Sequence, residues 1–116
     1  MKIPRIVLAG ATSGVGKTSI TCAIIHALQK KGYSVQPFKV GPDYIDPIYL
    51  SNISKHDVYN LDVWLMGKNQ LLNSFISNSK SDISIIEGVM GYYDGFGGDS
   101  NYASTHHVAT ITKSPV

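Results

Sequence analysis

A glycine-rich stretch near the start of the chain, Gly10–Thr18, constrains the fold more than any other feature. Its sequence is GATSGVGKT, and it follows an apolar run at residues 6–9 and precedes a helical pattern. A strand, a glycine-rich loop and a helix in this order are the context that a phosphate-binding loop requires. Ala11 stands where the motif G-x-x-x-x-G-K-[ST] has its first glycine, so we interpret the stretch as a variant loop. The alternative is a glycine-rich turn with a chance Gly-Lys-Thr.

The residues of this loop predict how phosphates would be held. Backbone N–H groups of the loop and of the helix start would surround phosphate oxygens. Lys17 would reach the β- and γ-phosphates, and the Thr18 hydroxyl would bind magnesium. We therefore expect the nucleotide to be bound by Thr12, Ser13, Gly14, Val15, Gly16, Lys17 and Thr18.

Composition narrows the class of protein. The chain has 116 residues, of which 43% are hydrophobic and 16% charged, which is typical of one small globular domain. No apolar run approaches the roughly 20 residues of a membrane span, and the start of the chain leaves no room for a signal peptide. One cysteine, Cys22, fits a reducing compartment. We therefore expect a cytoplasmic protein without a membrane partner. The net charge of +2 is too small to indicate nucleic-acid binding.

The pattern of apolar residues predicts alternating strands and helices. We expect strands at residues 5–9, 33–40 and 83–87 and helices at residues 16–31, 48–54, 69–79 and 102–112. Such alternation predicts an α/β fold of the P-loop NTPase type, with a mostly parallel sheet of about three strands flanked by helices. Pro37 predicts an edge or a bulge in the second strand. The chain stops where a further strand is expected, which indicates a truncated piece of a longer protein.

Residues 88–100 contain five glycines and predict a long flexible loop. We expect Ser100 or Asn101 to cap the helix that follows.

Two further loops are expected at the same edge of the sheet as the phosphate loop, because the carboxyl ends of parallel strands converge. The first, residues 38–47, carries Lys39, Asp43 and Asp46 between two prolines. The two carboxylates could bind magnesium, orient a substrate or assist proton movement. The equally weighted alternative is that both aspartates only form turns and helix caps.

The second of these loops follows the strand that ends in Glu87. An acid at this position is typical of a second magnesium ligand, although the usual residue is Asp. Gly88 and Gly91 would allow a ligand to approach the backbone. The alternative for Asp94 is that it only holds the shape of the loop.

Three motifs together resemble the cobyrinic acid a,c-diamide synthase family: ATSGVGKT, FKVGPDYIDP and EGVMGYYDG. Residues 60–67, NLDVWLMG, are also similar to that family, and the resemblance covers nearly the whole chain. Ni-sirohydrochlorin a,c-diamide synthase shares these motifs. The wider group includes dethiobiotin synthetase and, more distantly, division-site and partition ATPases.

The resemblance implies an ATP- and magnesium-dependent carboxylate-amide ligase. In that family ATP phosphorylates a peripheral carboxylate of a tetrapyrrole acid, and ammonia displaces the acyl phosphate at the a and c positions. The ammonia comes from glutamine through a C-terminal glutaminase domain whose nucleophile is a cysteine. Cys22 does not match that cysteine. Residues 1–116 are therefore expected to be the N-terminal part of the synthetase domain and to be inactive alone, and a homodimer is an expected assembly.

By the same resemblance, the site residues fall into three overlapping groups. The catalytic group is Lys17, Lys39, Asp43, Asp46 and Asp94; the metal ligands are Thr18, Asp46 and Glu87; the substrate-binding residues are Asp43, Tyr44, Gly91 and Tyr92.

Two alternatives stay open. A dethiobiotin-synthetase-like ligase is disfavoured by the DYIDP sequence at residues 43–47. A nucleotide switch that recruits protein partners usually carries a second lysine early in the loop, where this chain has Thr12. Trp64 and the pair Tyr92-Tyr93 could stack on a macrocycle or simply pack, and His106-His107 are not a ready metal pair because adjacent helical residues face different ways.

Overall fold

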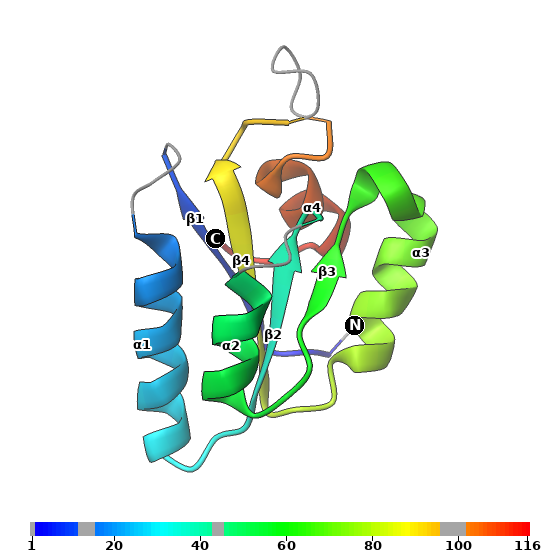
Figure 1. Ribbon diagram of the computed structural model, residues 1–116. Coiled ribbons are helices and arrows are strands. Elements are labelled where there is room, and N and C mark those ends of the chain that lie inside the picture. The colour runs from blue at the N-terminus through cyan, green and yellow to red at the C-terminus, as the bar shows by residue number, and fades with distance from the viewer. Residues whose placement is uncertain (1, 12–15, 43–45, 96–101) are drawn as a thin grey trace.

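The computed structural model describes residues 2–11, 16–42, 46–95 and 102–116, with only the backbone of Asp46. Four parallel strands form one sheet in the order β1-β4-β2-β3 (Figure 1). The elements are β1 (Arg5–Gly10), α1 (Lys17–Lys30), β2 (Val35–Val40), α2 (Asp46–Ser54), β3 (Tyr59–Leu61), α3 (Val63–Asn78), β4 (Ile83–Gly91) and α4 (Thr105–Thr112). The predicted α/β class and parallel sheet are confirmed. The expected number of strands is wrong, because β3 adds a fourth.

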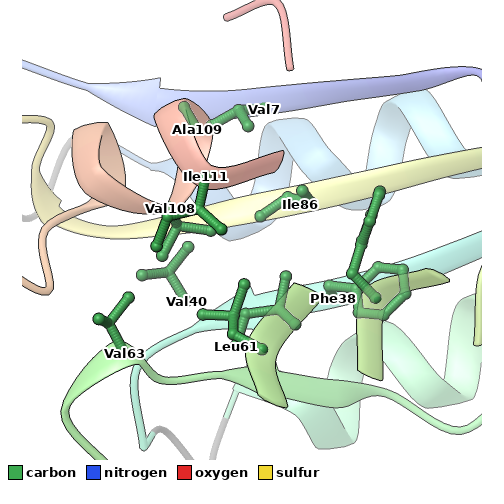
Figure 2. Packing of buried hydrophobic residues seen from close by; sticks show 11 residues of the cluster. Val7, Phe38, Val40, Leu61, Val63, Ile86, Val108, Ala109 and Ile111 are labelled. Carbon is green, nitrogen blue, oxygen red and sulfur yellow. The ribbon is translucent and has the colours of Figure 1, made fainter. Parts of the chain in front are cut away.

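Helices cover both faces of the sheet, so the domain has three layers (Figure 1). Helices α1 and α2 enclose one apolar cluster around Ile25, Leu50 and Ile85. Helices α3 and α4 enclose a larger cluster on the other face, which includes Phe75 and Ile86 (Figure 2). Ile85 and Ile86 are adjacent in β4 and enter opposite clusters, as alternating side chains of a strand must. The continuous apolar sequence of β4 follows from this burial on both faces.

The expectation that Pro37 marks an edge strand is wrong for β2, which lies between β4 and β3. The ladder between β2 and β3 begins only at Phe38. Before that point the side chain of Gln36 connects β2 to the residues that lead into β3. Its Nε2 donates to the carbonyl of Pro37 at 2.9 Å and to that of Asp57 at 2.7 Å. A residue without an N–H is thus tolerated inside the sheet.

Strand β4 continues to Gly91, four residues beyond the predicted end at Glu87. Gly88 is therefore part of a buried strand and not of a flexible loop. A Cβ at Gly88 would lie 2.8 Å from both Cγ2 and Oγ1 of Thr105, so only glycine allows α4 to pack this closely on β4. The start of α4 also differs from the prediction, since the helix begins at Thr105 and not at residue 102. Its N-cap is Ser104, whose Oγ accepts from the backbone N–H of His107 at 3.1 Å, whereas Ser100 and Asn101 lie outside the described residues.

Helix α3 begins six residues earlier than predicted. Asp62 is its N-cap, and its carboxylate accepts from the backbone N–H of Trp64 at 3.0 Å. Gly67 interrupts the helix with φ 74° and ψ 166°, which produces a kink. The kink separates a first turn above the carboxyl ends of the strands from the longer part that packs on the sheet (Figure 1).

The last residues of the chain lie along the outer edge of β1. The backbone N–H of Val7 donates to the carbonyl of Pro115 at 2.8 Å. The Arg5 guanidinium donates to the carbonyls of Thr112 at 3.0 Å and Lys113 at 2.9 Å. No helix within the described ranges is long and apolar enough to cross a membrane.

Candidate active site

The junction between β1 and α1 provides an unblocked helix start. Gly16 precedes α1 in a left-handed conformation, φ 80° and ψ 27°, and no side chain of the described residues caps the helix there. The first N–H groups of a helix and its dipole favour an anion at this position. Lys17 and Thr18 form the first turn of α1. The predicted nucleotide-binding residues Thr12, Ser13, Gly14 and Val15 lie outside the described residues.

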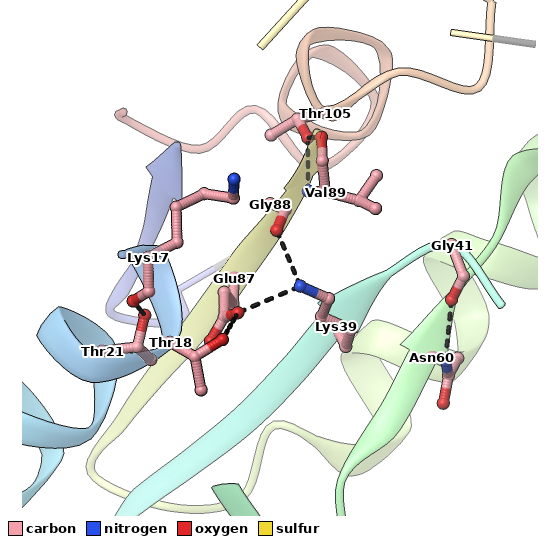
Figure 3. A network of polar contacts seen from close by, with 10 residues as sticks. All are labelled: Lys17, Thr18, Thr21, Lys39, Gly41, Asn60, Glu87, Gly88, Val89 and Thr105. Atoms are coloured by element: carbon pink, nitrogen blue, oxygen red, sulfur yellow. Dashed lines mark hydrogen bonds and ion pairs between the residues drawn. The ribbon is translucent and has the colours of Figure 1, made fainter. Parts of the chain in front are cut away.

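Three side chains from different elements meet beside this helix start, and we call them the Glu87 cluster: Thr18 of α1, Lys39 of β2 and Glu87 of β4 (Figure 3). The Thr18 hydroxyl donates to Glu87 Oε1 at 2.8 Å. Lys39 Nζ donates to the same oxygen at 3.0 Å and to the carbonyl of Gly88 at 2.9 Å. The parallel pairing of Lys39 with Glu87 across β2 and β4 sets this geometry.

The charges of this cluster are almost completely removed from water. Glu87 is 0% and Lys39 2% exposed. A buried ion pair needs its remaining polar atoms satisfied if it is not to cost free energy. Yet Glu87 Oε2 has no hydrogen-bond partner within the described part of the chain. The cluster therefore has one free acceptor, positioned beside the hydroxyl of Thr18.

The donor set of this cluster fits magnesium. Hydroxyl and carboxylate oxygens are the protein ligands that Mg²⁺ prefers, and it commonly takes only one or two of them together with phosphates and water. Thr18 supplies a hydroxyl oxygen, and Glu87 supplies an unpartnered one. No group of three or more His, Cys, Asp or Glu side chains gathers among the residues that the structure describes. The cluster is thus suited to a cation that arrives with a nucleotide.

The turn after β4 is joined to the end of β1. The N–H of Gly91 donates to Asp94 Oδ2 at 2.9 Å, and the N–H of Asp94 donates to the carbonyl of Gly91 at 3.0 Å. The N–H of Tyr92 donates to the carbonyl of Gly10 at 2.8 Å. A Cβ at Gly91 would lie 2.7 Å from the carbonyl oxygen of Ala11, so glycine is required there. In this structure the Asp94 carboxylate holds the shape of the turn.

Tyr92 packs in an aromatic group at the same edge. Its ring meets Tyr93 edge-on at 4.8 Å between centroids and His106 at 5.2 Å, and its hydroxyl lies 3.1 Å from His106 Nδ1. Burial and, second, the neighbouring Tyr93 raise the pKa of the Tyr92 phenol, so this phenol stays protonated at neutral pH. Of the other predicted substrate-side residues, Asp43 and Tyr44 lie outside the described residues, and Asp46 is described only as the first residue of α2.

A cavity of about 280 Å³ opens at the carboxyl ends of β2 and β4, and the sequence did not predict it. Its walls include Gly41 and Pro42 after β2, Asp62 and Trp64 at the start of α3, and Val89 of β4. The side chain of Asn60 fixes one wall, since its Nδ2 donates to the carbonyl of Gly41 at 2.7 Å. The available sequence signal was Asp62 before an apolar run, which is typical of a helix N-cap but not of a cavity wall.

Known proteins resemble the chain over its whole length. A family model described as CbiA: CobQ/CobB/MinD/ParA nucleotide binding domain matches residues 6–94. A relative from Leptospira interrogans serogroup Icterohaemorrhagiae serovar copenhageni, named cobyrinate a,c-diamide synthase, is 50% identical over 117 residues, covering 100% of this chain and 26% of the relative.

Two further relatives carry the same name. The one from Thermoplasma volcanium is 47% identical and covers 100% of this chain and 26% of its own length. The one from Listeria innocua serovar 6a is 48% identical and covers 97% of this chain and 25% of its own length. The chain therefore spans about a quarter of the length of these relatives, and the resemblance seen in the sequence motifs is confirmed.

Proposed function

The chain belongs to the family of CobQ/CobB/MinD/ParA nucleotide binding domains, and from this premise we propose that it is the ATP-binding part of an enzyme that amidates cobyrinate. The observation that carries the proposal is the Glu87 cluster, in which the first turn of α1 is hydrogen-bonded to an acid with one unpartnered oxygen. The names of the relatives supply the acceptor and the product, a diamide.

The proposed reaction has two steps for each carboxylate. A carboxylate oxygen of the acceptor attacks the γ-phosphorus of ATP, the bond from that phosphorus to the bridging oxygen breaks, and ADP leaves. Ammonia then attacks the carbonyl carbon of the acyl phosphate, phosphate leaves, and the nitrogen loses a proton. Glutamine, through a separate glutaminase domain, is the proposed ammonia source.

The described residues would act by positioning and by stabilising charge. Lys17 and the start of α1 would hold the phosphates, and Thr18 with Glu87 would hold magnesium, which neutralises charge on the transferring phosphoryl group. Asp46 is proposed as a further ligand. Asp43, Tyr44, Gly91, Tyr92 and Asp94 are proposed to face the acceptor, Asp94 acting at least through the turn that it holds.

Lys39 has a specific place in this proposal. Its ammonium donates to Glu87 Oε1 at 3.0 Å and neutralises the buried carboxylate. A second cation at Glu87 would compete with Lys39 for that carboxylate, since like charges repel more strongly where the surroundings exclude water. We propose that Lys39 then turns toward the acceptor carboxylate or the γ-phosphate. The Lys39 charge would thus neutralise Glu87 before the cation binds and the acceptor carboxylate or the γ-phosphate afterwards.

The test is whether ATP turnover by the full-length protein requires cobyrinate. We expect ADP formation with magnesium and ammonia to rise when the acid is added, with one ADP for each amide. Turnover that ignores the acid but responds to a protein partner would instead indicate a nucleotide switch. Turnover with another carboxylic acid and not with cobyrinate would indicate a different ligase.

The matched variants are Lys17→Ala and Lys30→Ala. Both remove one lysine from α1, but Lys30 is exposed and lies in the last turn. We expect about a 100-fold loss of turnover for Lys17→Ala, typical of losing one donor to transition-state charge, and no loss for Lys30→Ala. Equal activity of the two variants would remove Lys17 from the mechanism.

A further inference from the structure

The cavity at the carboxyl ends of β2 and β4 has walls and a polar atom that suit a particular kind of chemical group. We call it the Asp62 pocket, lined among others by Gly41, Asp62, Trp64, Val89 and Met90. Most of its surface is apolar, and its volume of about 280 Å³ is at the lower limit for a ligand site. It can therefore take one edge substituent of a large ligand and not a whole macrocycle.

One atom of this wall lacks a hydrogen-bond partner. Asp62 is 5% exposed, and its Oδ1 accepts from the N–H of Trp64 as the cap of α3. Its Oδ2 has no partner within the described ranges. A buried carboxylate oxygen left without a donor is costly. Serine or asparagine caps a helix equally well, so capping alone does not require this second oxygen.

The position of the pocket connects it to the proposed chemistry. Two of its walls are sequence neighbours of the Glu87 cluster: Gly41 follows Lys39 by two residues, and Val89 follows the Gly88 carbonyl to which Lys39 donates. Figure 3 shows Gly41 and Val89 at the same edge of the sheet as Lys39 and Glu87. A large ligand lying across this edge could therefore place one carboxylate toward Lys39 and another substituent in the pocket.

We propose that the Asp62 pocket binds the carboxamide that the first amidation creates and so orients the monoamide for the second. This inference rests on the proposed amidation of cobyrinate. An unreacted peripheral carboxylate has no hydrogen to donate and would be repelled by Asp62, whereas a carboxamide N–H₂ supplies the missing donor. Asp62 would thus distinguish an amidated position from an acidic one. Oδ2 is closed to solvent, so the amide would have to displace part of the wall. Trp64 and Met90 are the most exposed large side chains of that wall, at 56% and 45%.

The experiment compares binding of the diacid and of each monoamide to the full-length protein with magnesium and a non-hydrolysable ATP analogue. The variant is Asp62→Asn, which keeps an oxygen for the Trp64 N–H and replaces the second acceptor by an N–H₂ donor. We expect the preference for monoamide over diacid, taken as the ratio of their dissociation constants, to fall at least ~10-fold in the variant. The ratio cancels any loss of binding that affects both ligands equally.

Two more variants keep the result interpretable. Asp57→Asn removes an exposed carboxylate elsewhere on the surface and should leave the ratio unchanged. Asp62→Ser retains a good helix cap, and it serves if Asp62→Asn unfolds. We expect it to lower the ratio as well, because it too removes the acceptor.

The outcomes separate the two proposals. A ratio that stays the same in the Asp62 variants, while the parent binds both ligands, overturns the carboxamide site and leaves the amidation function standing. A parent protein that binds neither cobyrinate nor its monoamides overturns both. A ratio that falls equally in Asp57→Asn would show a general charge effect and also overturns the site.

Discussion

At the scale of single residues, the Lys39–Glu87 pair is the contact whose loss should matter most. Removing either partner leaves the other charge buried, which typically costs about 3–5 kcal/mol, whereas replacing both at once costs far less. We expect Lys39→Met and Glu87→Gln each to lower the free energy of unfolding. The double variant should be more stable than the sum of the two losses predicts.

The measurement is denaturant-induced unfolding of the parent, the two single variants and the double variant. Asp57→Asn, a carboxylate lost from the surface, is the control and should change little. Strictly additive losses would mean that Lys39 and Glu87 do not depend on one another. Turnover should fail in Glu87→Gln and in the double variant whatever their stability, if Glu87 holds the cation.

We expect the free energy of unfolding to depend on pH through the His107 side chain. Its Nδ1 accepts from the N–H of Ala103 at 3.0 Å, which requires the neutral ring. Burial, then His106 and Lys68, lower the pKa of His107. The unfolded chain therefore takes up this proton first as the pH falls, so stability is complete above about pH 6.5 and decreases below it until the folded pKa is reached.

The check is the unfolding midpoint of the parent and of His107→Asn between pH 8 and pH 5. Asparagine offers an acceptor to Ala103 but does not titrate. We expect the parent to lose more stability than the variant across this range. Parallel curves would show that His107 does not contribute to the pH dependence.

At the scale of elements, the close approach of α4 to β4 depends on Gly88. A methyl group there would meet Thr105 at 2.8 Å and the carbonyl of Leu8 at 3.1 Å. We expect Gly88→Ala to destabilise the protein by about 1–3 kcal/mol, as overpacking does. Thr105→Ala should cost about 1 kcal/mol by removing its hydrogen bond from the N–H of Val89.

The two changes should not add. Thr105→Ala removes both atoms that the Gly88 methyl would approach most closely, so the double variant should recover part of the loss. Thermal unfolding of all four proteins measures the coupling. A double variant that loses the full sum would mean that the carbonyl of Leu8, and not Thr105, sets the distance between these elements.

The elements that the sequence predicted well are those with long, continuous patterns. Strand β1, helix α1 and the start of β4 follow directly from apolar runs and from helical spacing. Strand β3 was missed because three residues, of which only Leu61 is buried, carry no readable period. The prediction of an edge strand from Pro37 is wrong because a missing N–H destabilises a strand only where a neighbouring strand would accept from it. The register shows that the ladder to β3 starts one residue after Pro37, and the local sequence does not contain this register.

The candidate site could be predicted from the sequence in part. Strand ends converge in a parallel sheet, which is why Thr18 and Glu87 could be expected at one edge, and they are hydrogen-bonded there. The ion pair of Lys39 depends on the register between β2 and β4, and the pocket at Asp62 on how separate elements pack, which local patterns do not contain. The roles of these residues remain proposals.

At the scale of the whole molecule, the site is assembled from one end of α1, β2 and β4, while the second half of α3 lies away from it (Figure 1). A ligand that binds only the assembled site should stabilise those elements against local opening. We expect ATP with magnesium to slow amide hydrogen exchange at the start of α1 and the end of β4. Residues 74–78, the last turn of α3, lie away from the site and should exchange at an unchanged rate.

Hydrogen exchange followed peptide by peptide in the full-length protein gives this result directly. The comparison with Lys17→Ala, at the same nucleotide concentration, provides the control. Protection that rises equally in all helices would mean that the nucleotide changes global stability without a local site at these strand ends.

The contacts of β1 with the last residues of the chain bear on how the domain is synthesised. Arg5 bonds to carbonyls 107 and 108 residues further on, and Val7 bonds to Pro115. At a ribosome rate of about 5–20 residues per second, the outer edge of β1 stays open for roughly 5–20 s before its partners have been made. Contacts so distant in sequence also form slowly because of the loop that they must close. Strand β1, although among the first segments to be translated, therefore gains these bonds only after residues 112–115 have been made.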